Sequence, residues 1–124
     1  MTAAWFRRIA LGMKDAAEGA HMGHPDFRVN GRIFATLHHD RKYGMVNLTP
    51  AQQAAFMRDN PAAFAPEPGA WGRQGCTAVR LDAVDEETLG EAMTLAWRHT
   101  MEKATRSRPK TSPSPRRAPR PRKR

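Results

Sequence analysis

Residues 24–37 read HPDFRVNGRIFATL, and this stretch decides the fold. Two short runs rich in Val, Ile, Phe and Thr flank the dipeptide Asn30-Gly31. Asn-Gly between such runs is the strongest short-range hairpin signal, because both central residues of a type I′ turn need a positive φ. The stretch therefore predicts an antiparallel hairpin. Its second strand is expected to alternate, with Ile33, Ala35 and Leu37 on one face and Phe34 and Thr36 on the other.

The chain on either side of this hairpin supplies the other elements of one small domain. Apolar residues at helical spacing predict a helix over residues 3–14, and residues 16–20 are expected to form a turn or the start of a strand. A polar turn at 38–42 leads into a strand at 43–48. A second helix is expected to begin at Thr49, whose hydroxyl caps it while Gln52 closes a capping box. It should end near Asn60, because Pro61 disfavours helical geometry before it.

The second half of the chain completes the predicted order. Residues 61–75 are rich in Pro and Gly and are expected to form a long loop, followed by a last strand at 77–81. Asp85 is placed to cap a final helix, in which Trp97 is expected to be buried against the sheet. The order predicts an α+β fold in which a twisted antiparallel sheet carries the N- and C-terminal helices on one face.

Charge divides the chain into two parts. The 124 residues include 21 Lys and Arg against 12 Asp and Glu, but residues 103–124 hold ten of the basic residues and none of the acidic ones. Residues 1–102 therefore carry a net charge of −1 and residues 103–124 a net charge of +10. We predict a folded domain over 1–102 and a disordered basic tail over 103–124, since the tail is too poor in apolar residues to form a core. Its cations are Lys103, Arg106, Arg108, Lys110, Arg116, Arg117, Arg120, Arg122, Lys123 and Arg124.

The tail carries the main functional signal. Flexible Lys and Arg side chains neutralise phosphates without reading bases, so the expected partner is nucleic acid, DNA rather than RNA, bound independently of sequence. Two other interpretations remain open for the tail: a solubilising extension and a non-specific anionic tether. In the second case the folded domain would be a small-ligand or protein-binding module.

Other function classes find little support. The single cysteine, Cys76, excludes an intrachain disulfide, and no segment is apolar enough to cross a bilayer or to act as an export signal. A cytoplasmic monomer, with or without association with the nucleoid, is expected. The five histidines lack the spacing of a zinc site, and there is no P-loop or nucleophile elbow, so neither a metal, a cofactor nor an enzyme activity is expected. We interpret Cys76 as a half-buried strand residue rather than as a nucleophile paired with a histidine.

Two loops of the domain have both a functional and a structural interpretation. In Trp71-Gly72-Arg73-Gln74-Gly75, the glycines could admit a ligand and Arg73 could meet its phosphate or carboxylate. The structural interpretation, which we favour, has Trp71 plugging the sheet and Arg73 paired with a carboxylate. His24-Pro25-Asp26 is interpreted as a turn in which Asp26 caps backbone N–H groups, rather than as a recognition corner beside Arg28. Candidate nucleic-acid contacts in the domain are Arg28, Arg32 and Arg73.

Five motifs, taken together, resemble those of the MmcQ/YjbR family of small bacterial proteins. They are HPDFRV (24–29), GRIFATL (31–37), TPAQQ (49–53), WGRQG (71–75) and a closing DEExL (85–89), and the resemblance covers residues 3–101. It implies a fold like that of the bacterial frataxin homologues and membership of a predicted DNA-binding family. The sequence departs from the pattern after Gly75, where Cys76 stands in place of an aromatic residue. Iron delivery, the function that the frataxin fold suggests, is not expected, because Arg7, Arg8 and Lys14 occupy the first helix where an acidic ridge would be needed.

Overall fold

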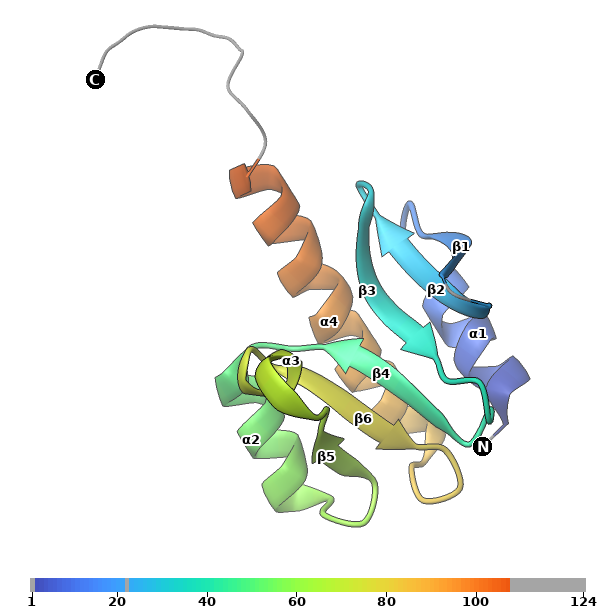
Figure 1. The fold of residues 1–124 in the computed structure, drawn as a ribbon, viewed down its shortest axis with the longest axis vertical. Helices are drawn as coiled ribbons and strands as arrows, with labels where there is room; N and C mark the ends of the chain where they lie inside the picture. The colour runs from blue at the N-terminus through green and yellow to red at the C-terminus, as the bar shows by residue number, and fades with distance from the viewer. Residues whose placement is uncertain (1, 22, 108–124) are drawn as a thin grey trace, which may run out of the picture.

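The computed structural model describes residues 2–21 and 23–107, and six of its elements are strands of one antiparallel sheet. The sheet has the order β1-β2-β3-β4-β6-β5 (Figure 1), which confirms the predicted α+β class. The elements are α1 (Ala3–Leu11), β1 (Ala17–His21), β2 (His24–Val29), β3 (Arg32–Leu37), β4 (Tyr43–Asn47), α2 (Pro50–Asp59), β5 (Phe64–Pro66), α3 (Gly69–Arg73), β6 (Cys76–Arg80) and α4 (Glu86–Ser107).

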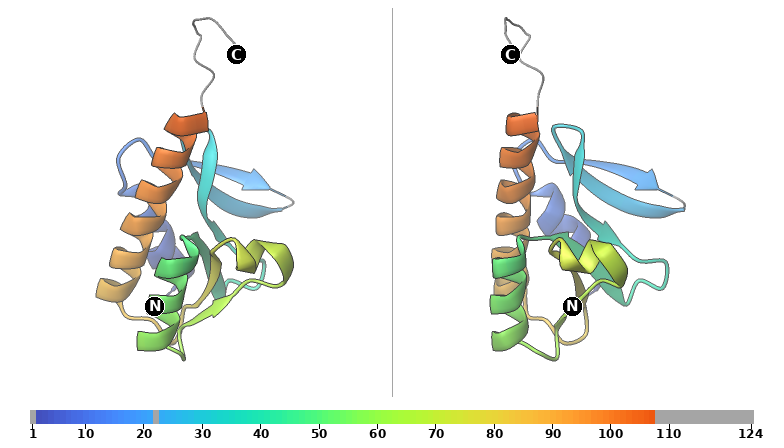
Figure 2. Two further views of the ribbon diagram at one scale, coloured as in Figure 1. Left: turned by 90° about the vertical axis from the view of Figure 1, so that its left-hand side faces the viewer. Right: turned by 60° about the vertical axis from the view of Figure 1, so that its left-hand side comes forward.

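The helices lie on both sides of the sheet. Helices α1, α2 and α4 cover one face, whereas the short α3 lies on the other (Figure 2). The core lies between the sheet and the first group, where Phe6 of α1 and Leu89 and Met93 of α4 are fully buried. The N- and C-terminal helices thus pack on one face, as predicted, and the opposite face of the sheet stays largely uncovered.

The central hairpin forms as the sequence predicts, but its second strand does not alternate strictly. Asn30 and Gly31 have φ angles of 53° and 78°, as a type I′ turn requires. Phe27 pairs with Ala35 while the next residue, Arg28, pairs with Ile33, so Phe34 is an extra, bulged residue. The bulge lets Phe34 and Ala35 both enter the core. The expectation that Phe34 shares a face with Thr36 is therefore wrong.

The segment 61–75 is not the predicted loop, because it contains β5 and α3. Phe64 is buried with its ring centroid 5.1 Å from that of Phe56, and this contact holds β5 against α2. β5 pairs with β6 from Phe64 to Pro66, and a proline is tolerated there because β5 is the edge strand.

The segment His24-Pro25-Asp26 is also not a turn. It forms the first half of β2, and Asp26 is a fully buried strand residue whose cross-strand partner is Thr36. The Asp26 carboxylate accepts hydrogen bonds from the Arg28 guanidinium, at 2.9 Å and 3.1 Å, instead of capping backbone N–H groups.

Helix α4 begins as predicted and ends later than predicted. The Asp85 carboxylate accepts a hydrogen bond from the backbone N–H of Thr88 at 2.7 Å, and this bond lowers the pKa of Asp85. The helix continues to Ser107, so the boundary at 102/103 that the charge pattern indicates falls inside it. Residues 103–107 are therefore helical, while the rest of the predicted tail, residues 108–124, lies outside the described residues.

Candidate functional site

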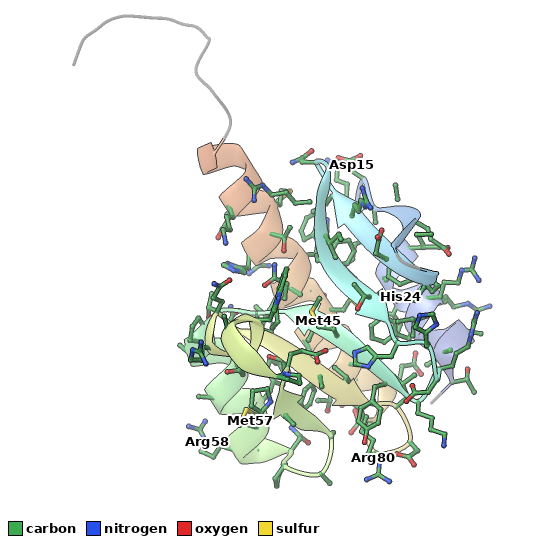
Figure 3. The ribbon with its side chains drawn as sticks, in the orientation of Figure 1. Asp15, His24, Met45, Met57, Arg58 and Arg80 are labelled. Atoms are coloured by element: carbon green, nitrogen blue, oxygen red, sulfur yellow. The ribbon has the colours of Figure 1, made fainter. Side chains whose placement is uncertain are left out.

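The uncovered face of the sheet carries a row of side chains that crosses every strand. The pairing register connects six residues across it: Gly19, Asp26, Thr36, Met45, Ala78 and Ala65. Figure 3 looks onto this face, with Met45 over the centre of the sheet and His24 on the β2 side. Most members of the row are short, and α3 is the one described helix on this side.

A cavity of about 230 Å³ opens between α3 and the sheet. Strands β3 and β4 form its floor, and the chain leading through α3 to β6 forms its wall. Trp71 lies at its rim with 70 % of its surface exposed, so the interpretation that Trp71 plugs the sheet is wrong. The lining residues are Thr36, Met45, Glu67, Pro68, Trp71 and Cys76.

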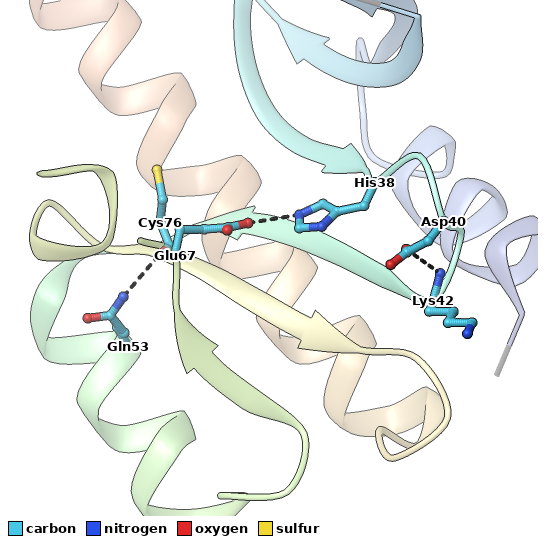
Figure 4. Close-up of polar contacts among 6 residues, drawn as sticks. All are labelled: His38, Asp40, Lys42, Gln53, Glu67 and Cys76. Atoms are coloured by element: carbon cyan, nitrogen blue, oxygen red, sulfur yellow. Dashed lines mark hydrogen bonds and ion pairs between the residues drawn. The ribbon is translucent and has the colours of Figure 1, made fainter. Parts of the chain in front are cut away.

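Hydrogen bonds from α2 hold helix α3 in place. The predicted capping box forms at the start of α2, where Thr49 accepts a hydrogen bond from the N–H of Gln52 and Gln52 accepts one from Thr49. One residue later, the amide nitrogen of Gln53 donates to the carbonyl oxygen of Gly72 at 3.0 Å and to that of Cys76 at 3.1 Å. Figure 4 shows the contact with Cys76. The motif at 49–53 therefore starts α2 and anchors the segment that carries Trp71.

Glycine allows this segment to lie so close to its neighbours. A Cβ on Gly72 would lie 1.9 Å from the carbonyl oxygen of Glu67, and one on Gly75 would lie 1.9 Å from that of Leu48. Gly75 also has a φ of 112°, which side-chain-bearing residues rarely adopt. The two glycines of the motif at 71–75 thus serve the backbone rather than a ligand.

A side-chain contact joins Glu67 of the cavity lining to His38 beside it. Nε2 of His38, just after β3, lies 2.9 Å from Oε2 of Glu67, just after β5 (Figure 4). The Glu67 side chain is only 16 % exposed and that of His38 35 %. Among the described residues, the other carboxylate oxygen of Glu67 has no hydrogen-bond partner. The cavity therefore presents a positioned, partly desolvated acceptor.

Cys76 lies on the cavity wall as an unreactive thiol. The residue is 5 % exposed, and its sulfur is 3.8 Å from Oδ1 of Asn47. Burial raises the pKa of the Cys76 thiol, the charge of Glu67 raises it further, and Lys103 acts in the opposite direction. A thiol with a raised pKa is a poor nucleophile, which agrees with the interpretation of Cys76 as a strand residue, although it is fully buried rather than half-buried.

The three arginines expected to contact a partner do not form one cluster. Arg28 and Arg32 belong to the β2–β3 hairpin, and Gly19 on the neighbouring strand leaves room for the pair between Arg28 and Asp26. Arg73 ends α3, which packs on β5 and β6 at the other end of the sheet order. Arg73 is exposed, and no carboxylate of the described residues pairs with it, so its expected structural ion pair is absent.

The basic residues of the predicted tail are only partly described. Lys103 is exposed on α4, close enough to Cys76 for its charge to act on the thiol, and Arg106 belongs to the last turn of α4. The other eight lie outside the described residues: Arg108, Lys110, Arg116, Arg117, Arg120, Arg122, Lys123 and Arg124.

The described residues hold neither a metal-binding cluster nor a membrane-spanning helix. Over 2–21 and 23–107, no three side chains of His, Cys, Asp or Glu are grouped so as to hold a metal ion. None of the described helices has the length and apolar character needed to span a membrane.

Sequence reasoning did not assign Glu67, His38, Thr36 or Met45 to a site. Glu67 is the one acidic residue between Pro61 and Gly75, which is a weak signal in retrospect. Its partner His38 is 29 residues away, and only the antiparallel order β3-β4-β6-β5 brings the two together.

Comparisons with known proteins agree with this architecture. The YjbR family model matches residues 11–99. The fold is similar to the crystal structure of the Deinococcus radiodurans protein DR2400, which has a DUF419 domain, with a TM-score of 0.65. The two chains are 16 % identical over 84 % of this chain and 88 % of that one, a level that shows the fold alone. No curated protein matches the sequence.

Proposed function

This chain belongs to the YjbR family, and from that premise we propose that it is a non-enzymatic nucleic-acid-binding protein with DNA as its main partner. The observation that carries the proposal is the separation of charge, with +10 at residues 103–124 and −1 over the rest. Ten cations without a compensating acid exceed what solubility requires. On a polyanion they release counterions, which supplies affinity without any base contact.

The position of α4 supports a shared contact between tail and domain. Its C-terminal end, with Lys103 and Arg106, lies at the same end of the molecule as the turn of the β2–β3 hairpin (Figures 1 and 2). Arg32 is exposed beside that turn. A phosphate backbone held by residues 103–124 would therefore pass near Arg32, whereas Arg73 lies on the far half of the sheet.

Salt dependence tests the proposal. Each phosphate neutralised contributes about −0.9 to the slope of log K against log [salt], so engagement of half to all ten cations gives a slope between about −4 and −9. We expect this slope for the full chain in a fluorescence titration with duplex DNA over about 50–200 mM salt. A slope near zero for the full chain would end the proposal.

The variants follow from the end of α4 at Ser107. Deleting residues 108–124 removes eight cations and lowers the net charge from +9 to +1, so most of the slope should be lost while the helix stays complete. Replacing the arginines of 108–124 by Gln in the full chain should have a similar effect. Scrambling the order of those residues is the matched control, and it should change little, because phosphate contact depends on charge and not on order.

The alternative function, a small-ligand or protein-binding module whose tail is only an anionic tether, has one observation in its favour. The cavity beside the exposed Trp71 is concave, partly apolar and furnished with a carboxylate, as ligand sites are. Under that alternative, the affinity for duplex DNA would be weak and the ligand would bind equally well after deletion of residues 108–124.

A further inference from the structure

An indole exposed at the rim of a cavity is a candidate surface for stacking a ligand. Trp71 and Leu11 are the two large apolar side chains that the described part of the chain exposes, at 70 % and 40 %. Leu11 ends α1 on the covered side of the sheet, away from any lining residue of the cavity. Trp71, in contrast, stands over a cavity whose other apolar members, Met45 and Pro68, continue its surface inward. A flat ring is the group that such an arrangement stacks best.

The polar side chains that line this cavity include the Glu67 carboxylate and the Thr36 hydroxyl, and none of them is cationic. Glu67 offers one carboxylate oxygen, its other oxygen being held by His38, and no Lys or Arg is among the lining residues. A phosphate would be repelled here. An exocyclic amino group suits the site, since it offers two N–H donors to the Glu67 carboxylate and its neighbours, whereas thymine has no amino group and offers only its ring N3–H.

The cations lie outside the cavity, which distinguishes between candidate ligands. Lys103 is exposed on α4 near Cys76, and Arg73 is exposed on the same short helix as Trp71. An arginine or lysine side chain could otherwise bind here, through a cation–π contact with Trp71 and an ion pair with Glu67. The nearby cations would repel such a side chain. They would favour a group that is neutral at its inner end and anionic outside. A nucleotide has this polarity.

We propose that the cavity between α3 and the sheet binds one amino-bearing nucleobase (cytosine, adenine or guanine), stacked on Trp71 and hydrogen-bonded to Glu67. The volume of about 230 Å³ is below the about 300–1,000 Å³ of pockets for drug-sized ligands, which suits a single heterocycle. A base paired in a duplex cannot enter such a cavity, so the ligand is single-stranded nucleic acid or a free nucleoside. In its strand form the inference rests on the proposed function, because the tail would supply most of the affinity for the phosphates of the strand.

The test compares single strands that differ only in the base. We would titrate the full chain with fluorescently labelled oligo-dC and oligo-dT of about 12 nucleotides, a length within the range of single-strand sites. The phosphates are identical, so the tail cannot discriminate between them. We expect dC to bind at least about fivefold more tightly. Trp71→Ala should weaken dC binding by about five- to a hundredfold, and Trp71→Phe should retain most of it.

Two further variants distinguish base binding in the cavity from a general effect of exposed apolar surface and from a structural role of Glu67. Leu11→Ala, the matched removal of the other exposed apolar side chain, should leave binding unchanged. Glu67→Gln should abolish the preference for dC over dT while leaving the salt slope unaltered, because an amide can present either a donor or an acceptor to the base. A merely structural Glu67 would instead weaken both strands equally.

The outcomes distinguish the cavity from the tail. If Trp71→Ala and Leu11→Ala bind oligo-dC with equal affinity and the salt slope stays steep, the cavity is not a base-binding site. The proposed function would be unaffected by that result. Loss of the slope would reject the proposed function, and saturation-transfer NMR with cytidine, adenosine and thymidine would then test the cavity alone. A saturation-transfer signal for cytidine and adenosine that disappears in Trp71→Ala would support a site for free nucleosides. If there is no such signal and oligo-dC binds no more tightly than oligo-dT, the inference is overturned.

Discussion

The indole Nε1 of Trp97 donates a hydrogen bond to the carbonyl oxygen of Lys14 at 2.9 Å, across 83 positions of the chain. Helical spacing predicts that this residue is buried against the sheet, but it is only partly buried and packs at the margin of the core. Its neighbours Ala92, Met93 and Ala96 fill the core instead. Trp97 therefore joins α4 to the connection between α1 and β1, and the expectation of full burial is corrected.

This bond makes a residue-scale prediction. Trp97→Phe keeps most of the apolar contact and removes the donor, so we expect a loss of about 1 kcal/mol in the free energy of unfolding, measured in urea. Trp71→Phe is the matched control, and it should cost nothing measurable because Trp71 is exposed. Equal effects of the two substitutions would contradict the role assigned to the bond.

The thiol of Cys76 reports the electrostatics of the cavity. Glu67 raises its pKa and Lys103 lowers it. Removing the negative charge with Glu67→Gln stabilises the thiolate and should lower the pKa, so alkylation by iodoacetamide at about pH 8 should become faster. Lys103→Gln should have the opposite sign and slow the reaction. The check is the pH–rate profile of each variant; shifts in the same direction would show that access, not charge, controls the reaction.

At the scale of elements, α3 depends on a contact that sequence patterns do not reveal. The helix has five residues and lacks a side-chain cap, so propensity contributes little to it. It exists because Gln53 of α2 holds the carbonyl oxygens of Gly72 and Cys76, and because Gly72 lets the helix lie against the backbone of Glu67. These contacts position both Trp71 and Glu67.

Two glycine substitutions should have opposite effects on stability. Gly72→Ala places a methyl group against the Glu67 carbonyl and should cost about 1–3 kcal/mol, as overpacking does. Gly90→Ala, within α4, meets no atom within 4 Å and should stabilise the protein by about 0.5–1 kcal/mol through its higher helix propensity. Thermal unfolding of both variants measures the difference. A neutral Gly72→Ala would mean that α3 can move away from Glu67 freely.

At the scale of the whole molecule, the boundary that the charge pattern predicts, between residues 102 and 103, falls within α4. The buried Thr100 is one turn before Lys103, and its hydroxyl lies 3.4 Å from Nδ2 of Asn47. A chain that stops at residue 102 loses the last five residues of the helix, 103–107, and keeps only two residues after Thr100. The boundary predicted from charge reflects composition alone. The end of the helix depends instead on its backbone hydrogen bonds and on the contacts that anchor it to the sheet.

Deletion of residues 108–124 and deletion of residues 103–124 should therefore have different effects on the free energy of unfolding. We expect that removing residues 108–124 changes the free energy of unfolding by less than about 0.5 kcal/mol, since the core described between Phe6 and Ala96 stays intact. Removing 103–124 should cost about 1 kcal/mol more, because the last turn frays and the contact between Thr100 and Asn47 weakens. Urea unfolding and far-ultraviolet circular dichroism compare the two. Equal stability would place the boundary back at residue 102.

Local signals in the sequence predict much of this fold. Asn30-Gly31, Thr49 with Gln52, and Asp85 each act within a few residues, and each forms the turn or cap that its chemistry predicts. The same reasoning fails between Pro61 and Gly75, where Pro and Gly suggest a loop. There, the pairing of β5 with β6 and the burial of Phe64 outweigh the local preference.

The sequence by itself determined the α+β class, the hairpin, the capped helices and the concentration of positive charge after residue 102, because each depends on neighbours along the chain or on composition. Only the tertiary structure decided the cavity. The strand order and the β3–β4 register bring the acceptor Glu67 next to His38. The hydrogen bond from Gln53 to α3 places the exposed Trp71 at the rim of the same cavity. Those contacts join residues far apart in the chain, and they form only when the sheet closes and each pairing stabilises the others.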